Sequence, residues 1–260
     1  LGRNRTLDTL LLGEDITAKE ALELGIELYE QRHLSAKGII QGSVVVLRNR
    51  DASILAATGG RRFYQDRSAA YGDFNRVTKS MRQPGSTMKP FAYLAAFRQG
   101  TFDLESMVPD EPIGVPDGES TKWISNYDQQ FKGMIPLREA LAESRNAVAI
   151  WLTGRIGIAS ILGTSRSLGV KTRLEPYATT ALGASEVNLL ELANAYRTMA
   201  SGIFPEPYVI RKIVRDTREV AADNEMQRST VDVNGPALAL IQEGLRGVVR
   251  MPTGTAHGLD

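Results

Sequence analysis

The 260-residue sequence contains no cysteine and only two histidines, His33 and His257. Without cysteine the chain forms no disulfide and has no thiol nucleophile. Two histidines are too few for a histidine-rich metal site, and they leave few candidates for the base of a serine–histidine–aspartate triad. We therefore expect both histidines to lie on the surface, and we expect no metal or other cofactor.

The sequence also lacks a long apolar run and an excess of charge of either sign. No stretch of about 18 apolar residues occurs, so no segment is expected to cross a membrane. The net charge of +1 gives no general argument for binding nucleic acid. The first residue is not methionine and no signal peptide follows it, so we expect a chain cut from a longer protein. A hydrophobic content of 42% allows a sizeable core, in one large domain or two small ones.

Charge is nonetheless uneven along the chain. Residues 61–98 contain eight basic and two acidic residues, whereas residues 103–119 contain six acidic residues and no basic one. A basic neighbourhood around Ser86 suits a substrate that carries a carboxylate. A solvated surface face explains the same composition equally well.

The most informative stretch runs from Arg82 to Phe97 and reads RQPGSTMKPFAYLAAF. It holds the only Ser-x-x-Lys pattern in the chain, formed by Ser86 and Lys89. The apolar run after Lys89 predicts a buried helix, with Ser86 in its first turn. Residues three apart share a helix face, about 5–6 Å apart at Cβ, so the lysine can reach the serine hydroxyl. An uncharged lysine can then activate a serine nucleophile. The alternative is a capping serine beside an exposed lysine.

A second polar segment interrupts an apolar helical pattern about 55 residues later. Ser144, Arg145 and Asn146 form the only Ser-x-Asn pattern in the chain and separate two predicted helices. Such a break is either a simple turn or a site. In a site, the Ser144 hydroxyl can relay a proton and the Asn146 amide can hold a substrate carbonyl.

Serine–lysine acyl-transfer enzymes carry Ser-x-x-Lys, then Ser-x-Asn, then Lys-Thr-Gly, and the first two patterns occur here in that order. The surrounding segments are more specific than the patterns themselves. They are Thr6-Leu7-Asp8, Gly59-Gly60, Phe74-Asn75-Arg76, Asn126-Tyr127-Asp128, Gly133, LREALAESRN at 137–146, Ala181-Leu182-Gly183 and Ala193-Asn194-Ala195-Tyr196. In these segments the chain resembles, over nearly its whole length, the transpeptidase domain of the class A, bifunctional penicillin-binding proteins.

The third pattern of this family, Lys-Thr-Gly, is missing. Lys171-Thr172-Arg173 has arginine in place of glycine and follows Ser144 too closely, and Pro252-Thr253-Gly254-Thr255 has proline in the lysine position. Proline is poorly tolerated in the core strand that carries this pattern in the family. We interpret the segment around Thr253 as the helix end and turn that precede the lysine pattern; a degenerate third motif is the alternative. The pattern is then expected beyond Asp260, and residues 1–260 alone are not expected to be a competent enzyme.

Periodicity and capping signals give a coarse map of the elements. A capping box at Thr17–Glu20 predicts a helix that includes Leu22 and Ile26. A β-hairpin is expected from 43–47 and 52–57, and loops are expected over 61–81 and 101–134. The remaining elements are helices near 137–153, 158–167 and 187–200, a strand at 208–214, and a helix from 234 to about 250.

These strands are too few to close off a core. The resemblance accounts for the deficit, because it implies an α/β (α+β) fold in which an antiparallel sheet has helices on both faces and its last strands follow the lysine pattern. It also implies that residues 1–260 form one transpeptidase domain, incomplete at its C-terminus. A glycosyltransferase domain and a membrane anchor are expected before Leu1, so the chain reaches the membrane only through that anchor.

The resemblance implies D-alanyl-D-alanine transpeptidation of peptidoglycan on the extracytoplasmic face of the bacterial inner membrane. Ser86 attacks the carbonyl between the two D-alanines, and its backbone amide forms half of the oxyanion hole. Lys89 takes the serine proton, for which burial and the helix N-terminus must lower its pKa. Ser144 passes the proton to the leaving amine, and Asn146 holds the substrate backbone. The partners are donor and acceptor stem peptides, with β-lactams as covalent inhibitors of Ser86.

Two other classes of function remain open from the sequence. A serine D,D-carboxypeptidase or a β-lactamase shares the chemistry up to the acyl-enzyme, so Ser86 and Lys89 do not discriminate between them. A non-catalytic wall-binding or β-lactam-sensing module is the third possibility. It is favoured if the natural continuation lacks the lysine pattern.

Overall fold

The computed structural model describes residues 20, 22–27, 41–60, 74–210, 213–215, 218–221, 229–230 and 235–258. The chain divides into two compact units. Unit 1 comprises Leu1–Met81, Asn188–Arg197 and Pro205–Arg228, and unit 2 comprises Arg82–Val187, Thr198–Phe204 and Ser229–Asp260. All four predicted site residues belong to unit 2.

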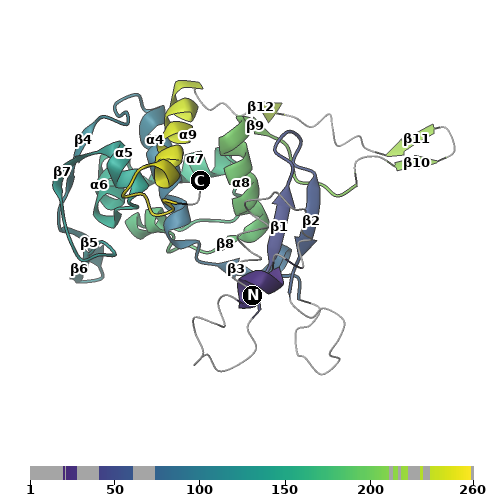
Figure 1. The fold of residues 1–260 in the computed structure, drawn as a ribbon, viewed down its shortest axis with the longest axis horizontal. Helices are drawn as coiled ribbons and strands as arrows, with labels where there is room; N and C mark the ends of the chain where they lie inside the picture. The colour runs from purple at the N-terminus through teal and green to yellow at the C-terminus, as the bar shows by residue number, and fades with distance from the viewer. Residues whose placement is uncertain are drawn as a thin grey trace. The chain divides into compact units, whose positions relative to one another are not determined.

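Unit 1 contains the expected β-hairpin. Strands β1 (Val44–Leu47) and β2 (Ile54–Thr58) pair antiparallel and lie side by side in Figure 1. Asp51 closes their connection, because its Oδ1 accepts hydrogen bonds from the Ser53 backbone N–H (3.0 Å) and hydroxyl (2.8 Å). Burial opposes ionisation, but these bonds outweigh it and lower the pKa of Asp51 to about 2.

Other expectations for unit 1 are only partly met. The capping box at Thr17 lies outside the described residues, although residues 22–27 are helical with Leu22 and Ile26 buried. The loop expected over 61–81 is wrong where it is described, since residues 76–79 form helix α3 (Arg76–Lys79) and Met81 begins β3 (Met81–Arg82). Asn75 caps α3 by accepting the Val77 N–H at 3.0 Å.

The expected strand at 208–214 is displaced. Tyr208 makes only an isolated parallel bridge to Ser53, and regular strands begin further on, at β10 (Ile213–Arg215) and β11 (Arg218–Ala221). The helix expected at 187–200 is confirmed as α8 (Leu189–Ser201), preceded by the short strand β8 (Val187–Asn188).

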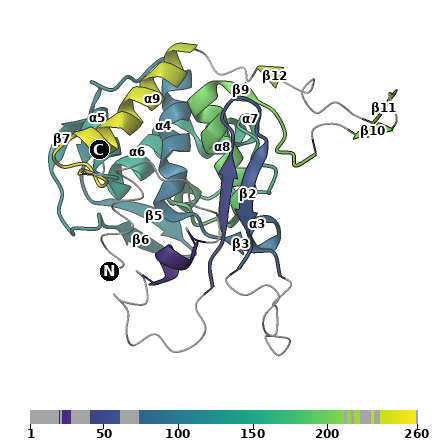
Figure 2. The ribbon, with the colours of Figure 1, turned by 45° about the vertical axis from the view of Figure 1, so that its right-hand side comes forward.

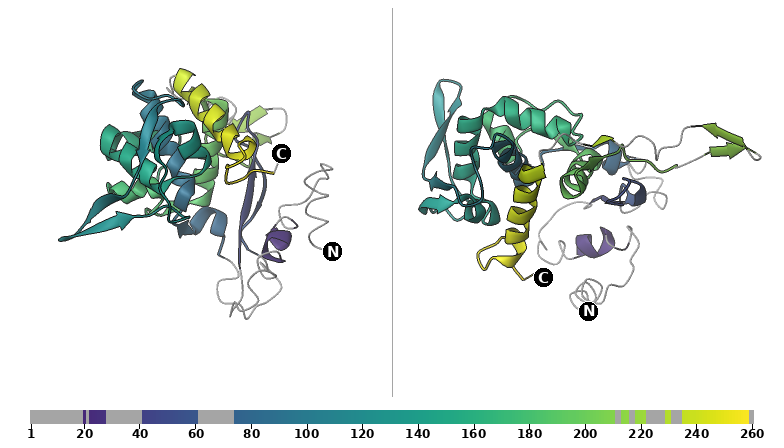
Figure 3. Two further views of the ribbon diagram at one scale, coloured as in Figure 1. Left: turned by 60° about the vertical axis from the view of Figure 1, so that its left-hand side comes forward. Right: turned by 90° about the horizontal axis from the view of Figure 1, so that it is seen from above.

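A buried helix forms the centre of unit 2. The 3₁₀ turn η1 (Gly85–Met88) leads directly into α4 (Lys89–Arg98), and every residue of α4 from Lys89 to Phe97 is buried. A helix that is apolar all round is stable only inside a core. The helices packed around α4 confirm this position: α5 (Leu137–Ala142), α6 (Asn146–Ile156), α7 (Ile158–Ser167) and α9 (Gly235–Arg250). Helix α9, yellow in Figures 2 and 3, runs beside α4 and α5.

The loop expected over 101–134 is wrong. This segment contains two antiparallel pairs, β4 (Met107–Asp110) with β7 (Gly133–Pro136), and β5 (Ile113–Asp117) with β6 (Ser120–Ile124). In these short strands a buried residue lies between more exposed neighbours, as at Val108 in β4 and Ile135 in β7. The many prolines, glycines and acidic residues make this alternation hard to recognise in the sequence. Gly118 and Glu119 form the two-residue connection between β5 and β6, and Gly118 has the positive φ (62°) that favours glycine at the first position of such a turn.

The remaining described elements of unit 2 are η2 (Ala178–Leu182), β9 (Ile203–Phe204) and β12 (Ser229–Thr230), with β9 and β12 paired antiparallel. Within the described part of the chain, no single helix is long and apolar enough to span a membrane. Helices α6 and α7 pass that test only when taken together, and they meet at 97°. The same residues contain no group of three or more side chains that could hold a metal ion.

Candidate active site

Ser86 lies in η1, at the solvent-exposed end of the buried helix α4. The Lys89 backbone N–H donates to the Ser86 carbonyl, which sets the two residues one turn apart. The neighbouring η2 fixes η1 by close backbone contact, because a Cβ on Gly183 would lie 2.2 Å from the Gly85 carbonyl oxygen. Glycine is required at 183 for this contact and for its φ of 80°. The structure therefore presents the Ser86 hydroxyl to solvent on a well-packed turn.

Lys89 is buried, with 2% of its surface exposed. Its Nζ donates to the Ser144 hydroxyl at 2.9 Å and also to the Ser144 carbonyl oxygen. Burial, and after it the positive charge of Arg145, lower the pKa of Lys89 to about 8. The pKa of Lys89 is thus lowered, as a general base requires, by burial first and by the charge of Arg145 second.

Ser144 occupies the end of α5 in a conformation that favours glycine. The Arg145 N–H donates to the Ala140 carbonyl (2.9 Å) and the Ser144 N–H to the Leu141 carbonyl (3.1 Å). These two bonds define a Schellman motif, in which the residue at the position of Ser144 is left-handed and most often glycine. Ser144 has a φ of 57°. The helix end thus turns the Ser144 hydroxyl and carbonyl together toward Lys89.

Asn146 is the first residue of α6, and its helix start is capped from another segment. Asn126 Oδ1 accepts the backbone N–H groups of Asn146 (2.7 Å) and Ala147 (3.2 Å). The side-chain amide of Asn146 donates to the Ser125 carbonyl at 2.8 Å. That bond points the Asn146 side chain along the segment that carries Asn126 and uses one of the two N–H donors of its amide.

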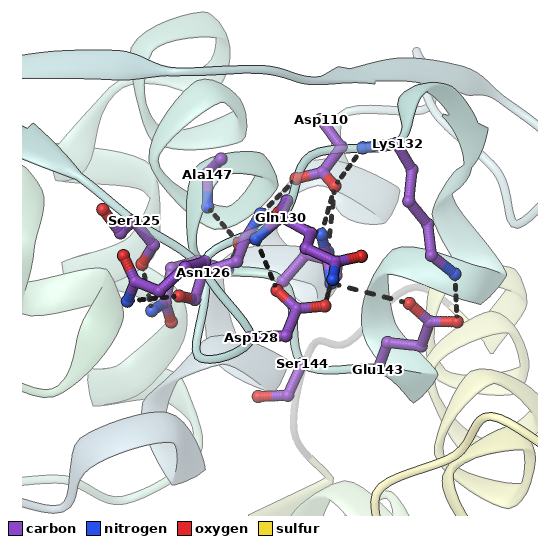
Figure 4. Close-up of polar contacts among 12 residues, drawn as sticks. Asp110, Ser125, Asn126, Asp128, Gln130, Lys132, Glu143, Ser144 and Ala147 are labelled. Atoms are coloured by element: carbon purple, nitrogen blue, oxygen red, sulfur yellow. Dashed lines mark hydrogen bonds and ion pairs between the residues drawn. The ribbon is translucent and has the colours of Figure 1, made fainter.

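Arg145, between the two motif residues, is buried and paired with Asp110. Its Nε donates to Asp110 Oδ2 at 2.9 Å, and its other nitrogens reach Asp128 Oδ2 (2.7 Å) and the Gln130 carbonyl (2.6 Å). Asn126 Nδ2 donates to Asp110 Oδ1 at 2.8 Å, so both carboxylate oxygens are engaged. Figure 4 shows this network beside Ser144.

A cavity of about 300 Å³ opens beside Ser144. Its lining includes Tyr127, Asp128, Lys132 and Glu143, together with Thr253 from the turn after α9. Lys132 bridges Glu139 (2.7 Å) and Glu143 (2.6 Å) at this rim. Ion-paired side chains thus line the cavity, and Ser144 lies in its wall.

Thr253 lies in a turn and not in a strand. Helix α9 ends at Arg250, and the following turn is tied back to the body of the unit by the Thr255 N–H, which donates to the Ala142 carbonyl at 3.0 Å. A Cβ on Gly254 would lie 2.2 Å from the Val248 carbonyl oxygen, so the turn needs glycine there. This geometry supports the helix-end interpretation over a strand-borne third motif.

The structure thus brings Lys89 and Ser144 into direct contact, places Ser86 one turn before Lys89, and starts α6 at Asn146. Sequence reasoning missed Asp110 and the role of Arg145. Asp110 stood only in an acid-rich stretch and had no signal of its own. Arg145 and Asn126 lay within recognised segments, but nothing in the sequence showed that their side chains meet.

Three comparisons with known proteins agree. A family model described as penicillin binding protein transpeptidase domain matches residues 42–260. Penicillin-binding protein 1A of Aquifex aeolicus is 35% identical over 187 residues, which make up 71% of this chain and 25% of that protein. The protein of the same name from Neisseria lactamica is 33% identical over 231 residues, or 85% of this chain and 28% of the relative.

Among solved structures, penicillin-binding protein 1A from Haemophilus influenzae matches with a TM-score of 0.69 and 25% sequence identity, over 85% of this chain and 36% of that one. This match confirms the expected α/β (α+β) fold class, and the family model confirms the resemblance read from the motifs. The chain spans about a quarter of the length of the curated relatives described above.

Proposed function

Because this chain belongs to the penicillin-binding protein transpeptidase family, we propose that it is a serine D-alanyl-D-alanine transpeptidase that forms an acyl-enzyme on Ser86. One observation carries the proposal. An exposed serine stands one turn before a buried lysine whose Nζ bonds to a second hydroxyl, that of Ser144. A serine beside a base that a third group orients is the arrangement expected of nucleophilic catalysis.

In the acylation step, Ser86 Oγ bonds to the carbonyl carbon between the two D-alanines while its proton passes to Lys89 Nζ. The tetrahedral oxyanion is stabilised by backbone N–H groups, of which the Ser86 amide supplies one. As the C–N bond breaks, the proton moves from Lys89 through the Ser144 hydroxyl to the leaving D-alanine amine. The 2.9 Å contact between Lys89 and Ser144 supports this relay.

The second half-reaction transfers the acyl group to an amine of an acceptor stem peptide and frees Ser86. Asn146 holds the donor's backbone through its side-chain amide. With a pKa of about 8, roughly one tenth of Lys89 is neutral at pH 7, so acylation should accelerate as pH rises toward 8 and above. β-Lactams, which resemble the donor, acylate the same serine.

The setting of the reaction follows from its substrates. We place both compact units in one transpeptidase domain that works on peptidoglycan at the extracytoplasmic face of the inner membrane. Donor and acceptor stem peptides are its partners. The relatives are about four times as long as the matched region. We propose that the whole protein also contains a glycosyltransferase domain and a membrane anchor.

Acylation at Ser86 is tested with the intact protein and a fluorescent penicillin. The label should appear on the peptide that contains Ser86, and Ser86→Ala should remove it while leaving the melting temperature nearly unchanged, since Ser86 is exposed. Thr87→Ala, at the next exposed position of η1, serves as the control and should keep the label. A label on another serine, or equal labelling of Ser86→Ala, contradicts the proposal.

The fate of the acyl group separates the transpeptidase from a carboxypeptidase or a β-lactamase. A stem-peptide donor is supplied with and without an acceptor amine, and the products are separated by mass. Formation of the cross-linked product supports transpeptidation. Hydrolysis alone, at equal rates with and without acceptor, indicates a hydrolase that uses the same residues.

A further inference from the structure

The turn that carries Ser144 is held from both sides by groups that lie outside the three-residue motif. On its N-terminal side, the Schellman bonds to Ala140 and Leu141 fix the end of α5. On its C-terminal side, Asn126 accepts the first N–H groups of α6, because Arg145, which stands at the N-cap, provides no side-chain cap of its own. Ser144 is therefore the short left-handed link between two anchored helix ends.

Asp110 joins these anchors into one buried unit. It is fully buried, and its two oxygens accept from Asn126 Nδ2, Arg145 Nε and the Lys132 backbone N–H. A buried ion pair contributes little net stability, because desolvation of both charges offsets their attraction. Its consequence here is geometric, since it sets the position of Asn126 and of the Arg145 backbone, and these flank Ser144.

We propose that Asp110, Asn126 and Arg145 form a buried scaffold that positions the Ser144 turn against Lys89 and holds the charged Arg145 next in the chain to the residue that Lys89 contacts. This inference rests on the proposed function for its catalytic meaning. None of the three residues touches a reacting atom, so each is a positioning residue. The scaffold is drawn in Figure 4 around Asp110 and Asn126.

The charge of Arg145 acts on Lys89 in the direction that a general base needs, because a positive neighbour favours the neutral amine. Asp110 and Asp128 pair with Arg145, and Glu143 lies 3.8 Å from Arg145 and pairs with Lys132. The turns η1 and η2 carry no charged residue. The helices packed against α4 carry Arg138, Glu139, Arg155, Arg166, Glu243, Arg246 and Arg250, none of which contributes to the shift at Lys89.

Two substitutions should move the pKa of Lys89 in opposite directions. Arg145→Gln removes the positive charge and leaves Asp110 behind, so the Lys89 pKa rises. Asp110→Asn keeps one acceptor for Asn126 but removes the negative charge that is paired with Arg145. The positive charge of Arg145 then acts more strongly on Lys89, so the Lys89 pKa falls. If the scaffold acted only on stability, the two substitutions would not shift the Lys89 pKa in opposite directions.

The test measures fluorescent-penicillin acylation of the intact protein from pH 6 to pH 10. In Arg145→Gln, the acidic limb of the profile, where the acylation rate rises with pH, should move to higher pH by about 1 unit. Acylation at pH 7 should slow at least about tenfold. In Asp110→Asn, the limb should move to lower pH. The maximal acylation rate, or plateau, should also fall, because the Ser144 turn loosens. Arg145→Lys keeps the charge but loses the forked contacts, so its limb should stay in place while its plateau falls.

Ile161→Ala, in the buried face of α7, is the control for lost stability. It should lower the melting temperature without moving the limb. The proposal is overturned if Arg145→Gln and Asp110→Asn shift the limb in the same direction or not at all. It is also overturned if their acylation rates match the control at equal melting temperature.

A second readout separates this inference from the proposed function. Carbon-13 labelled lysine reports the titration of Lys89 by NMR without any turnover, with Lys89→Met assigning the resonance. If Ser86 is not acylated but the resonance shifts in opposite directions, the scaffold holds and the proposed function fails. If acylation proceeds and the titration is unchanged in both variants, the scaffold fails and the function holds. Should Arg145→Gln not fold, Arg145→Lys and Asp110→Asn still decide the outcome.

Discussion

Ser144 combines a hydroxyl that accepts a hydrogen bond from Lys89 with a backbone conformation that favours glycine. At this position of a helix end, a non-glycine residue carries a strain of about 1 kcal/mol. The backbone conformation at position 144 therefore favours glycine, whereas the contact with Lys89 requires a hydroxyl. The presence of serine is explained by the hydroxyl, and the buried bonds around it hold the strained turn in place.

This conflict gives a matched pair of substitutions. Ser144→Gly and Ser144→Ala both remove the hydroxyl, so both should slow acylation of the intact protein by a similar factor, about 10²-fold or more. Only glycine relieves the left-handed strain, so Ser144→Gly should be more stable than Ser144→Ala by about 1 kcal/mol. Chemical denaturation and penicillin labelling measure the two effects. Near-native acylation by either variant would remove Ser144 from the proton path.

At the scale of elements, Ser86 depends on the contact between two 3₁₀ turns. Gly183, at the end of η2, stands against the Gly85 backbone in η1, where backbone atoms leave no room for a side chain. Helix α4 carries Lys89 inward from η1, and α5 delivers Ser144 to it. The site is thus assembled from three element ends, each fixed by packing rather than by its own propensity.

Gly183→Ala tests this assembly, with Gly118→Ala as the control. Both glycines have positive φ (80° and 62°), so both substitutions introduce about 1 kcal/mol of backbone strain. Gly118 has open space around it, whereas a Cβ at 183 meets Gly85 at 2.2 Å. Gly183→Ala should therefore lower the melting temperature further and also slow labelling of Ser86. Equal behaviour of the two variants would show that the η1–η2 contact does not support the nucleophile.

On the scale of the whole molecule, the burial of Lys89 should change how the free energy of unfolding depends on pH. The pKa of Lys89 falls from 10.5 to about 8 on folding, so the charged lysine is destabilised in the folded state. Below pH 8 this costs about 3 kcal/mol, and the cost disappears as pH rises from 8 to 10.5. The site is therefore maintained by the stability of the surrounding core.

Lys89→Met should raise the free energy of unfolding of the intact protein at pH 7, by at most about 3 kcal/mol because the bonds to Ser144 are lost. The gain should shrink between pH 8 and pH 10.5, while acylation falls by at least about 10²-fold. Lys122→Met, at an exposed lysine of β6, is the control and should show no pH-dependent gain. Destabilisation by Lys89→Met at every pH would contradict the burial argument.

The sequence by itself determined the elements with strong periodicity and the order of the motifs. Helix α7 was predicted at its observed bounds, and the β1–β2 hairpin and α9 within one or two residues. Burial on one face leaves a periodic apolar pattern, and burial on all faces leaves a continuous apolar run. The spacing of Ser86 and Lys89 likewise follows from helix geometry alone.

Only the tertiary structure decided what surrounds Ser144. Asp110 and Arg145 are 35 residues apart, and Asn126 caps a helix that begins 20 residues later. Such contacts depend on the pairing of β4 with β7 and on the packing of α5 and of α6 against β4, which no local pattern encodes. The left-handed backbone of Ser144 was equally invisible, because serine carries no preference for it. Local periodicity thus specifies which segments are buried, whereas charge and hydrogen-bond partners are settled only when distant segments meet.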